Sequence, residues 1–361
     1  MYKYDEVKRQ IIDDVSMMKP HQKIMSRPAM CRKYQVTRTT VERAVSELVK
    51  SGILYSNVGS GTFVSEEMSD KLSSGVVDVS NWGVVIPHIQ YDLYPDLLNG
   101  ICSVAEANGI NVMVCETDND INRQHTQIKR YIDSGVRGLI IVPSTNDTSD
   151  IRAFQALYNR KIPFIFCNRS VPTMAGVPLV ASNDFYGGYI ATKLLIERHY
   201  RRIAYLSLIA YKSSLDRYYG YMAALMEHGI EVDRGIIKMN LGNSQNGAVK
   251  QCALKMLNME DPPDAFFCFN DRLLKEVYMA ADELGLAISD EVGVIGYDNT
   301  NLCQTLSVKA TSISFKPAEI GTTAANLLLR LIAGEKIDNP YVCVFQPEII
   351  ERDSCKGKVD A

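Results

Sequence analysis

The chain has 361 residues, 46% of them hydrophobic and 22% charged, with a net charge of −3. These values are those of an ordinary globular protein, and no apolar run is long enough to span a membrane. At this length we expect two or three compact units. The charge is uneven, because residues 1–64 carry 11 Lys/Arg and 6 Asp/Glu, hence +5, which leaves −8 for the remainder. A basic first part on an acidic body is typical of a DNA-binding domain joined to a domain that does not bind DNA.

The chain has nine cysteines, an odd number without any Cys-x-x-Cys pair. We expect reduced, mostly buried thiols in a cytoplasmic protein. The sequence starts without an apolar signal region. Its five histidines are widely spread, and no motif of a nucleophile, phosphate-binding loop or metal site is present. We therefore predict no enzyme activity, no cofactor and no metal site.

Residues 30–48 predict two short helices joined by a tight turn at residues 34–36. Their apolar side chains recur at spacings that let both helices bury a common face. Thr37 is a suitable N-cap for the second helix. The first turn of that helix directs Arg38, Thr39 and Thr40 outward, where a recognition helix contacts base edges and phosphates.

Residues 52–64 predict a β-hairpin wing after the second helix. Glycines at its tip allow positive φ and a close approach of the backbone to a phosphate. Residues 19–50 carry eight Lys/Arg against two Glu, and such a basic patch is the electrostatic footprint of DNA binding. A three-helix bundle with a solvated basic face is the alternative. The predicted DNA contacts are Arg27, Thr37, Arg38, Thr39, Thr40, Arg43, Gly59, Ser60 and Gly61.

Residues 1–64 resemble the GntR family of bacterial regulators. The matching positions are Tyr4 and Val7, Val36-Thr37-Arg38-Thr39-Thr40-Val41 and Gly59-Ser60-Gly61-Thr62-Phe63-Val64. The resemblance implies a winged helix-turn-helix that binds duplex operator DNA. Pro28 and Glu42 depart from it, because each stands where the family usually has an arginine. We therefore expect an operator that differs from the family consensus.

Residues 67–81 have the polar, small side chains of a linker. Beyond them, buried strands alternate with amphipathic helices, which predicts an α/β fold of parallel sheets with helices on both faces. The number of strands favours two doubly wound lobes with a cleft between them. We expect a DNA-binding domain at 1–66, a linker at 67–81 and a two-lobed effector domain at 82–361, with lobe 1 at about 82–180 and 313–338 and lobe 2 at about 181–312 and 339–355. Helices are expected at 94–107, 123–134, 151–159, 189–198, 216–227 and 273–284.

Polar side chains follow several predicted strands, at the edge where such sheets bind ligands. Arginine and aspartate can each engage two vicinal hydroxyls. The set therefore suits a polyhydroxylated ligand. Its members are His88, Gln90, Arg169, Asn270 and Asp298, with Arg217 near the start of a helix.

From residue 82 to about residue 353 the chain resembles the effector domain of LacI/GalR regulators and periplasmic sugar-binding proteins. The matching segments include Gly135-Val136-Arg137-Gly138, Arg217-x-x-Gly220, Phe269-Asn270-Asp271 and Gly296-Tyr297-Asp298-Asn299. The resemblance implies that Arg217, Asn270 and Asp298 contact the ligand. It also places Tyr94 in the lining of the pocket. Asn243-Ser244 departs from it, because several relatives have a stacking aromatic there.

Each of these residues has a purely structural alternative. Arg217 and Asp298 could form an ion pair between lobes. Asn270 could only cap the helix that follows it, and Asp184 could cap a helix beginning past residue 187. Arg169, His88 and Gln90 could face solvent.

Together, these features predict a transcriptional repressor of carbohydrate-utilisation genes. A homodimer paired through the effector domains would place two recognition helices on a two-fold operator. A small sugar or sugar-like effector between the lobes would alter the affinity for DNA. The alternatives are a regulator with a nucleoside or other polar metabolite as effector, and a solute-binding protein of a transport system, which would need an export signal and have no use for the basic head.

Overall fold

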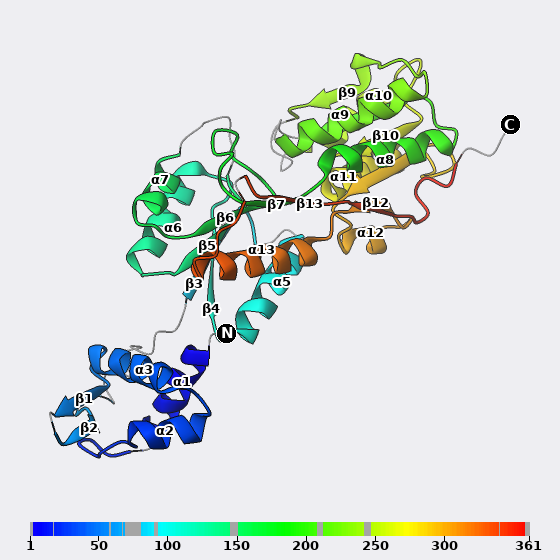
Figure 1. Cartoon of the computed structure of the whole chain (residues 1–361). Helices are drawn as coiled ribbons and strands as arrows, with labels where there is room; N and C mark the ends of the chain where they lie inside the picture. Colours follow the sequence, from blue (N-terminus) through cyan, green and yellow to red (C-terminus); the bar gives the residue numbers. More distant parts are fainter. Residues whose placement is uncertain are drawn as a thin grey trace. The chain divides into compact units, whose positions relative to one another are not determined.

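The computed structural model describes residues 3–16, 18–57, 59–66, 68, 81–89, 93–144, 151–207, 212–241, 247–338 and 340–357. The chain forms two compact units, one of Met1–Ser80 with Asn108–Asn111 and one of Asn81–Ala107 with Val112–Ala361 (Figure 1). The predicted linker lies outside the described residues, apart from its positions 68 and 81. Among the helices of the described part, none is long and apolar enough to cross a membrane.

In its described residues, the first unit contains three helices and a two-stranded hairpin. Its elements are α1 (Lys3–Ser16), α2 (Arg27–Tyr34), α3 (Arg38–Lys50), β1 (Leu54–Asn57) and β2 (Gly61–Val64). The two strands pair antiparallel, and the segment before α2 joins them, since the amide of Ile24 donates to the carbonyl of Thr62 over 3.0 Å. Apolar side chains of all three helices meet in one core. The predicted winged helix-turn-helix is therefore confirmed.

The second unit contains two six-stranded sheets, each at the centre of an α/β lobe. The strand orders are β13-β7-β6-β5-β3-β4 in lobe 1 and β14-β12-β11-β10-β8-β9 in lobe 2. Strand β14 runs antiparallel to β12, whereas the other neighbours with a described register run parallel. The predicted two-lobed α/β fold is confirmed.

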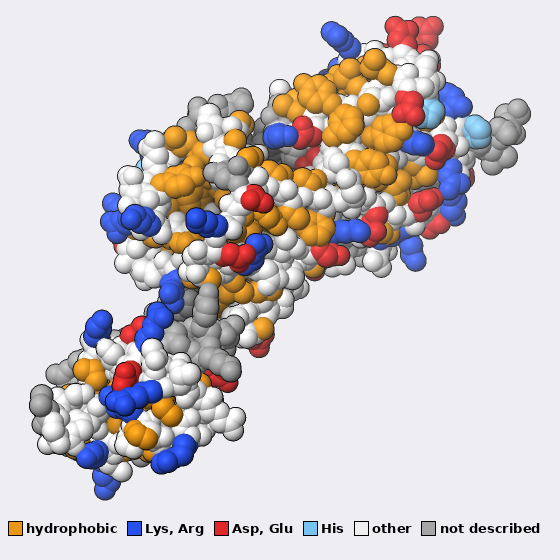
Figure 2. Space-filling view, in the orientation of Figure 1, with side chains coloured by type: hydrophobic (Ala, Val, Ile, Leu, Met, Phe, Trp, Pro, Cys, Tyr) orange, Lys and Arg blue, Asp and Glu red, His pale blue; other side chains and the backbone are white. Residues whose placement is uncertain are grey.

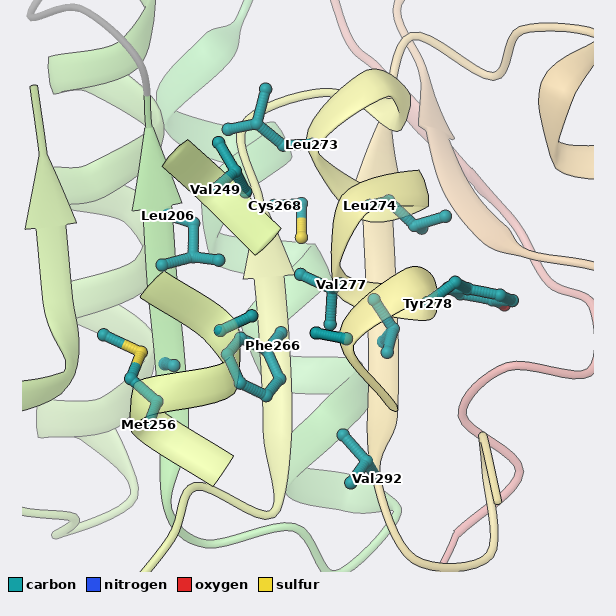
Figure 3. Packing of buried hydrophobic residues seen from close by; sticks show 14 of the residues in the cluster. Leu206, Val249, Met256, Phe266, Cys268, Leu273, Leu274, Val277, Tyr278 and Val292 are labelled. Atoms are coloured by element: carbon teal, nitrogen blue, oxygen red, sulfur yellow. The ribbon is translucent and has the colours of Figure 1, made fainter. Parts of the chain in front are cut away.

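Lobe 1 comprises β3 (Asn81–Ile86), α5 (Leu93–Ala107), β4 (Asn111–Glu116), α6 (Ile121–Asp133), β5 (Gly138–Ile141), α7 (Arg152–Asn159), β6 (Phe164–Cys167), β7 (Leu179–Ser182), α13 (Pro317–Ile332) and β13 (Val342–Phe345). Lobe 2 comprises α8 (Asp184–Glu197), β8 (Ile203–Ser207), α9 (Lys212–Glu227), a 3-10 turn at Arg234–Ile236, β9 (Ile237–Met239), α10 (Ala248–Leu257), β10 (Ala265–Cys268), α11 (Asp271–Leu284), β11 (Gly293–Tyr297), α12 (Leu302–Thr305), β12 (Thr311–Ser314) and β14 (Glu348–Ile350). The central strands are apolar runs buried along their whole length, because helices cover both faces of each sheet. Figure 3 shows this packing in lobe 2, where Phe266 of β10 lies beside Val277 of α11 and Met256 of α10.

Several boundaries differ from the predicted ones; α9, for example, starts at Lys212, four residues before its predicted start. Strand β13 pairs in parallel with β7 and so belongs to the sheet of lobe 1, although residues 339–355 were expected in lobe 2. Helix α8 begins at Asp184, five residues before the predicted start, and therefore contains Gly187 and Gly188. A Cβ on Gly188 would lie 2.1 Å from the carbonyl oxygen of Arg217. These glycines do not precede a helix. Gly188 lets α8 pack closely on α9, and Gly187 lies against Tyr297 of β11, whose hydroxyl would be 2.3 Å from an added Cβ.

Candidate DNA interface and effector site

The recognition helix α3 starts where the sequence indicates. Gln35 has a φ of 52° at the end of α2, which makes the tight turn. Thr37 is the N-cap of α3, because its hydroxyl accepts from the amide of Thr40 over 3.4 Å. The hydroxyls of Thr37 and Thr40 also lie 2.9 Å apart. Two predicted DNA contacts therefore stabilise the start of the helix, whereas Arg38 and Thr39 are exposed beside them.

The exposed face of α3 carries a carboxylate between its arginines. Nε of Arg38 lies 2.8 Å from Oε1 of Glu42, and the two side chains are 76% and 52% exposed. Arg43 is exposed on the same helix. Exposed pairs of this kind contribute less than about 1 kcal/mol, so a phosphate can replace Glu42 as the partner of Arg38. Glu42 thus lowers the attraction for DNA without removing the cation.

Arg27, the first residue of α2, forms a hydrogen bond to the wing. Its Nη2 donates to Oγ1 of Thr62 over 3.1 Å. The hydroxyl of Thr62 lies in turn 3.0 Å from that of Ser56 across the hairpin. Burial lowers the pKa of Arg27, and the charge of Glu42 opposes this. Arg27 therefore sets the position of the wing, and its contact with a phosphate stays a prediction.

The tip of the wing has the backbone that the glycines predict. Gly59 and Gly61 have φ of 78° and 119°. A Cβ on Gly61 would lie 2.6 Å from Cε of Lys23, which is the mobile end of a side chain, so the positive φ and not lack of space favours glycine here. Ser60 is exposed between them. The tip offers small side chains and accessible backbone, which suits close contact with a phosphate.

In lobe 2, Arg217 is the centre of a buried charged cluster. Its side chain, 7% exposed, donates from Nε to Oδ1 of Asp184 over 2.8 Å and from Nη1 to the carbonyl of Phe269 over 2.6 Å. Nη1 also lies 3.8 Å from Oδ1 of Asp298. The guanidinium carbon is 3.4 Å from the ring centroid of Tyr297, a cation–π contact. Since Arg217 and Asp298 both belong to lobe 2, the alternative of an ion pair between lobes is wrong.

Asp298 follows β11 with a φ of 95° and a side chain that is 10% exposed. Burial raises its pKa to about 7, and the charges of Arg217 and, from lobe 1, Arg169 oppose the rise. The adjoining loop is held by buried Asp271, whose Oδ2 accepts from the amide of Thr300 over 2.7 Å. Arg169 follows β6 of lobe 1 and Asp298 follows β11 of lobe 2. Their electrostatic interaction therefore acts between the carboxyl ends of strands in the two lobes.

The raised pKa of Asp298 predicts a pH dependence of stability. An unfolded aspartate titrates near ~3.9, so between that value and about 7 the folded chain keeps a proton that the unfolded chain loses. The stabilisation that this proton gives to the folded chain is complete below the pKa of the unfolded state and is lost as the pH rises through the pKa of the folded state. Asp298→Asn should therefore gain stability relative to the parent between pH 4 and pH 7, by at most about 1.4 kcal/mol per pH unit. Urea unfolding of both chains at several pH values measures this, and a pH-independent difference would contradict it.

In lobe 1, two predicted site residues join one polar network. Nη1 of Arg169 donates to Oδ1 of Asn119 over 2.9 Å. Nδ1 of His88 lies 3.3 Å from Oδ1 of Asp118 and 3.7 Å from Oε1 of Glu116. Burial lowers the pKa of His88, and the positive charge of Arg169 lowers it further, whereas the carboxylates of Asp118 and Glu116 raise it. His88 and Arg169 are therefore not isolated surface residues.

The remaining predicted effector residues have different positions. Asn270 is the N-cap of α11, since its Oδ1 accepts from the amide of Leu273 over 3.1 Å. The capping role of Asn270 is thus confirmed, and its contact with a ligand stays a prediction. Tyr94 is 1% exposed in α5, so it is packed in the interior. Gln90 lies outside the described residues.

Sequence reasoning missed the partners of the predicted residues. Asp184 binds Arg217, whereas the cap of α8 is Asn183, which accepts from the amide of Tyr186 over 3.1 Å. The expectation that Asp184 caps a helix is therefore wrong. Glu116 is the last residue of β4 and Asp118 lies two residues after it. The carboxyl end of this strand was the signal that could have identified both residues.

Comparison with known proteins identifies both parts of the chain. Residues 3–64 match the model of the bacterial regulatory proteins of the gntR family. Residues 192–355 match the model of the periplasmic binding protein-like domain. The chain therefore carries a GntR-type helix-turn-helix domain and a periplasmic-binding-protein-like domain.

Individual relatives have the same organisation in whole or in part. The arabinose metabolism transcriptional repressor of Geobacillus stearothermophilus is 28% identical over 360 residues, which are 98% of each chain. The HTH-type transcriptional repressor PurR of Vibrio atlanticus is 28% identical over 275 residues, 76% of this chain and 80% of that protein. Among solved structures, a LacI family transcriptional regulator from Enterococcus faecium with bound ribose is 25% identical. It has a TM-score of 0.65 and covers 78% of this chain and 100% of its own.

Proposed function

We propose that this chain, which joins a GntR-type DNA-binding domain to a periplasmic-binding-protein-like domain, is a transcriptional repressor of sugar-utilisation genes whose DNA affinity is set by a small sugar. One observation carries the proposal: the same chain contains a capped recognition helix and a two-lobed domain with buried charged residues near the carboxyl ends of its strands. The similarity along 98% of both chains to a protein named as an arabinose metabolism repressor supports it.

The DNA-binding half of the proposal assigns α3 to the major groove and the wing to the neighbouring backbone. Arg38, Thr39 and Arg43 supply exposed donors, and Gly59, Ser60 and Gly61 supply accessible backbone. We propose a homodimer that presents two such helices to a two-fold operator.

Substitutions on α3 test this assignment with opposite signs. Arg38→Ala should weaken binding to a duplex selected by the protein and reduce the steepness of its salt dependence, because one phosphate contact is lost. Glu42→Gln should strengthen binding, because it removes the carboxylate that holds Arg38. Fluorescence anisotropy at 50–200 mM salt measures both, with Arg330→Ala in lobe 1, an exposed arginine paired with Glu335, as the matched control. Unchanged affinity in both α3 variants would refute the assignment.

The effector half of the proposal assigns the ligand to the charged groups at the strand ends of both lobes. Arg169 of lobe 1 and Asp298 of lobe 2 would act from opposite sides, with Arg217 behind Asp298. A guanidinium and a carboxylate can each form hydrogen bonds to two neighbouring hydroxyls of a sugar. Pentoses are the first candidates, because one relative is named for arabinose metabolism and another was solved with ribose.

A thermal-shift screen tests the effector half. Pentoses, hexoses, sugar acids and nucleosides are compared, and we expect a pentose to raise the Tm of the parent chain through preferential binding to the folded state. Asp298→Asn should lose the shift, whereas Asp290→Asn, an exposed aspartate of lobe 2, should keep it. Stabilisation only by nucleosides would replace the sugar with that class. No stabilising compound, or an equal response of Asp298→Asn, would refute the site.

A further inference from the structure

Three side chains with metal-binding atoms meet where β3 and β4 end. They are His88, Glu116 and Asp118, and their donor atoms all lie within 4.8 Å of one another. Nδ1 of His88 is 3.3 Å from Oδ1 of Asp118 and 3.7 Å from Oε1 of Glu116. The sequence predicts no metal site because these residues stand 28 and 2 positions apart and form no spaced motif.

The backbone fixes the distance between these residues. The amide of Thr117 donates to the carbonyl of Ile86 over 3.0 Å, and that of Asp118 donates to the carbonyl of Pro87 over 2.8 Å. Pairing of β3 with β4 thus continues beyond both strands into the loops that carry the donors. The buried hydroxyl of Thr117 lies 2.8 Å from that of Ser144, which ties the turn to the end of β5. The cluster is therefore positioned by the sheet.

The carboxylates are oriented so that one oxygen of each remains directed at His88. Oε2 of Glu116 accepts from the amide of Ile89 over 3.2 Å. Oδ2 of Asp118 accepts from Nη1 of Arg123 over 3.0 Å. The other oxygens, Oε1 and Oδ1, are those nearest Nδ1 of the imidazole. Two carboxylate oxygens and one imidazole nitrogen thus lie close enough together to share one cation.

We propose that His88, Glu116 and Asp118 bind a first-row divalent cation such as Mn²⁺ or Zn²⁺ in lobe 1. One imidazole with two carboxylates suits these ions, whereas Ca²⁺ and Mg²⁺ prefer oxygen donors alone. Three protein ligands leave further coordination positions for water or for a hydroxyl of a bound molecule. The site goes beyond the proposed sugar response, since binding of the ion can be measured without any sugar.

Arg123 distinguishes a cation site from a simple cluster of ion pairs. Its side chain, 63% exposed, pairs with the outer oxygen of Asp118. A metal ion and the guanidinium of Arg123 are both attracted to the carboxylate of Asp118, so they compete for it. In a cluster that is only an ion-pair network, Arg123 has no ion to compete with.

Titration of the untagged full-length chain with Mn²⁺, followed by electron paramagnetic resonance of the free ion, tests the proposal. Mn²⁺ is the probe because the nine thiols would bind Zn²⁺ elsewhere. We expect one Mn²⁺ per chain, an affinity at least tenfold weaker in His88→Gln and Asp118→Asn, and displacement by Zn²⁺. The matched control is Asp120→Asn, because Asp120 caps α6 through its bond to the amide of Arg123 and asparagine caps equally well.

Arg123→Gln supplies a gain of binding that misfolding cannot imitate. We expect it to tighten Mn²⁺ binding several-fold by removing the competing cation. No binding to the parent chain would overturn the proposal. So would binding that survives His88→Gln and Asp118→Asn, or an Arg123→Gln chain that binds no more tightly than the parent. A missing thermal response to sugars would leave these results unaffected, so failure of the two proposals can be told apart.

Discussion

Arg217→Ala should destabilise the chain by about 3–5 kcal/mol, the cost expected when one member of a buried charge cluster is removed. The side chain is 7% exposed and satisfies Asp184 and the carbonyl of Phe269. Its loss leaves Asp184 buried without its cation and opens space beside the ring of Tyr297. Urea unfolding measures the effect.

The control for this prediction is an exposed arginine of the same lobe. Arg198 pairs with Glu351 over 2.8 Å, and the two side chains are 43% and 55% exposed. Arg198→Ala should cost less than about 1 kcal/mol. If both variants cost the same, the buried cluster does not organise lobe 2. Because Arg217 supports the fold, its replacement is a poor probe of ligand binding, and Asp298→Asn is the better one.

Gly220→Ala should also destabilise lobe 2 strongly, by about 1–3 kcal/mol or more. A Cβ at this position would lie 2.0 Å from the carbonyl oxygen of Phe185 and 2.6 Å from the amide of Tyr189. These are backbone atoms of α8, so the two helices must separate. Separation moves Arg217 on α9 away from Asp184 on α8, and the response to sugar should weaken together with stability.

An exposed position on the same helix provides the comparison. Met226 of α9 is 67% exposed, and Met226→Ala should change the free energy of unfolding by no more than about 0.5 kcal/mol. A Gly220→Ala chain as stable as Met226→Ala would show that α8 and α9 need not pack so closely.

Local features of the head could be predicted because the residues that decide them are neighbours. Thr37 caps α3 through Thr40, three positions away, and Gln35 makes the turn beside it. The central strands of both lobes could be predicted for the same reason, since an apolar run bounded by polar residues is a local signal. Helices α10, α12 and α13 were not predicted and are known only from the structure.

The candidate site depends on residues that are distant in sequence, and there prediction was incomplete. Resemblance to known regulators picked out Arg217 and Asp298, but the partner of Arg217 is 33 positions earlier in α8. The glycines at 187 and 188 indicate a helix start when only the local pattern is considered. Their close contacts with Tyr297 and Arg217 require the tertiary structure to be recognised.

A chain that couples a sugar to DNA must bind DNA with a different affinity when the sugar is bound. A duplex selected by the chain is titrated in the absence and presence of the pentose that raises its Tm, with Asp298→Asn measured in parallel. We predict a change in Kd of at least about fivefold for the parent, within the usual range of allosteric coupling, and none for Asp298→Asn. An equal Kd with and without saturating sugar in the parent chain would contradict the account.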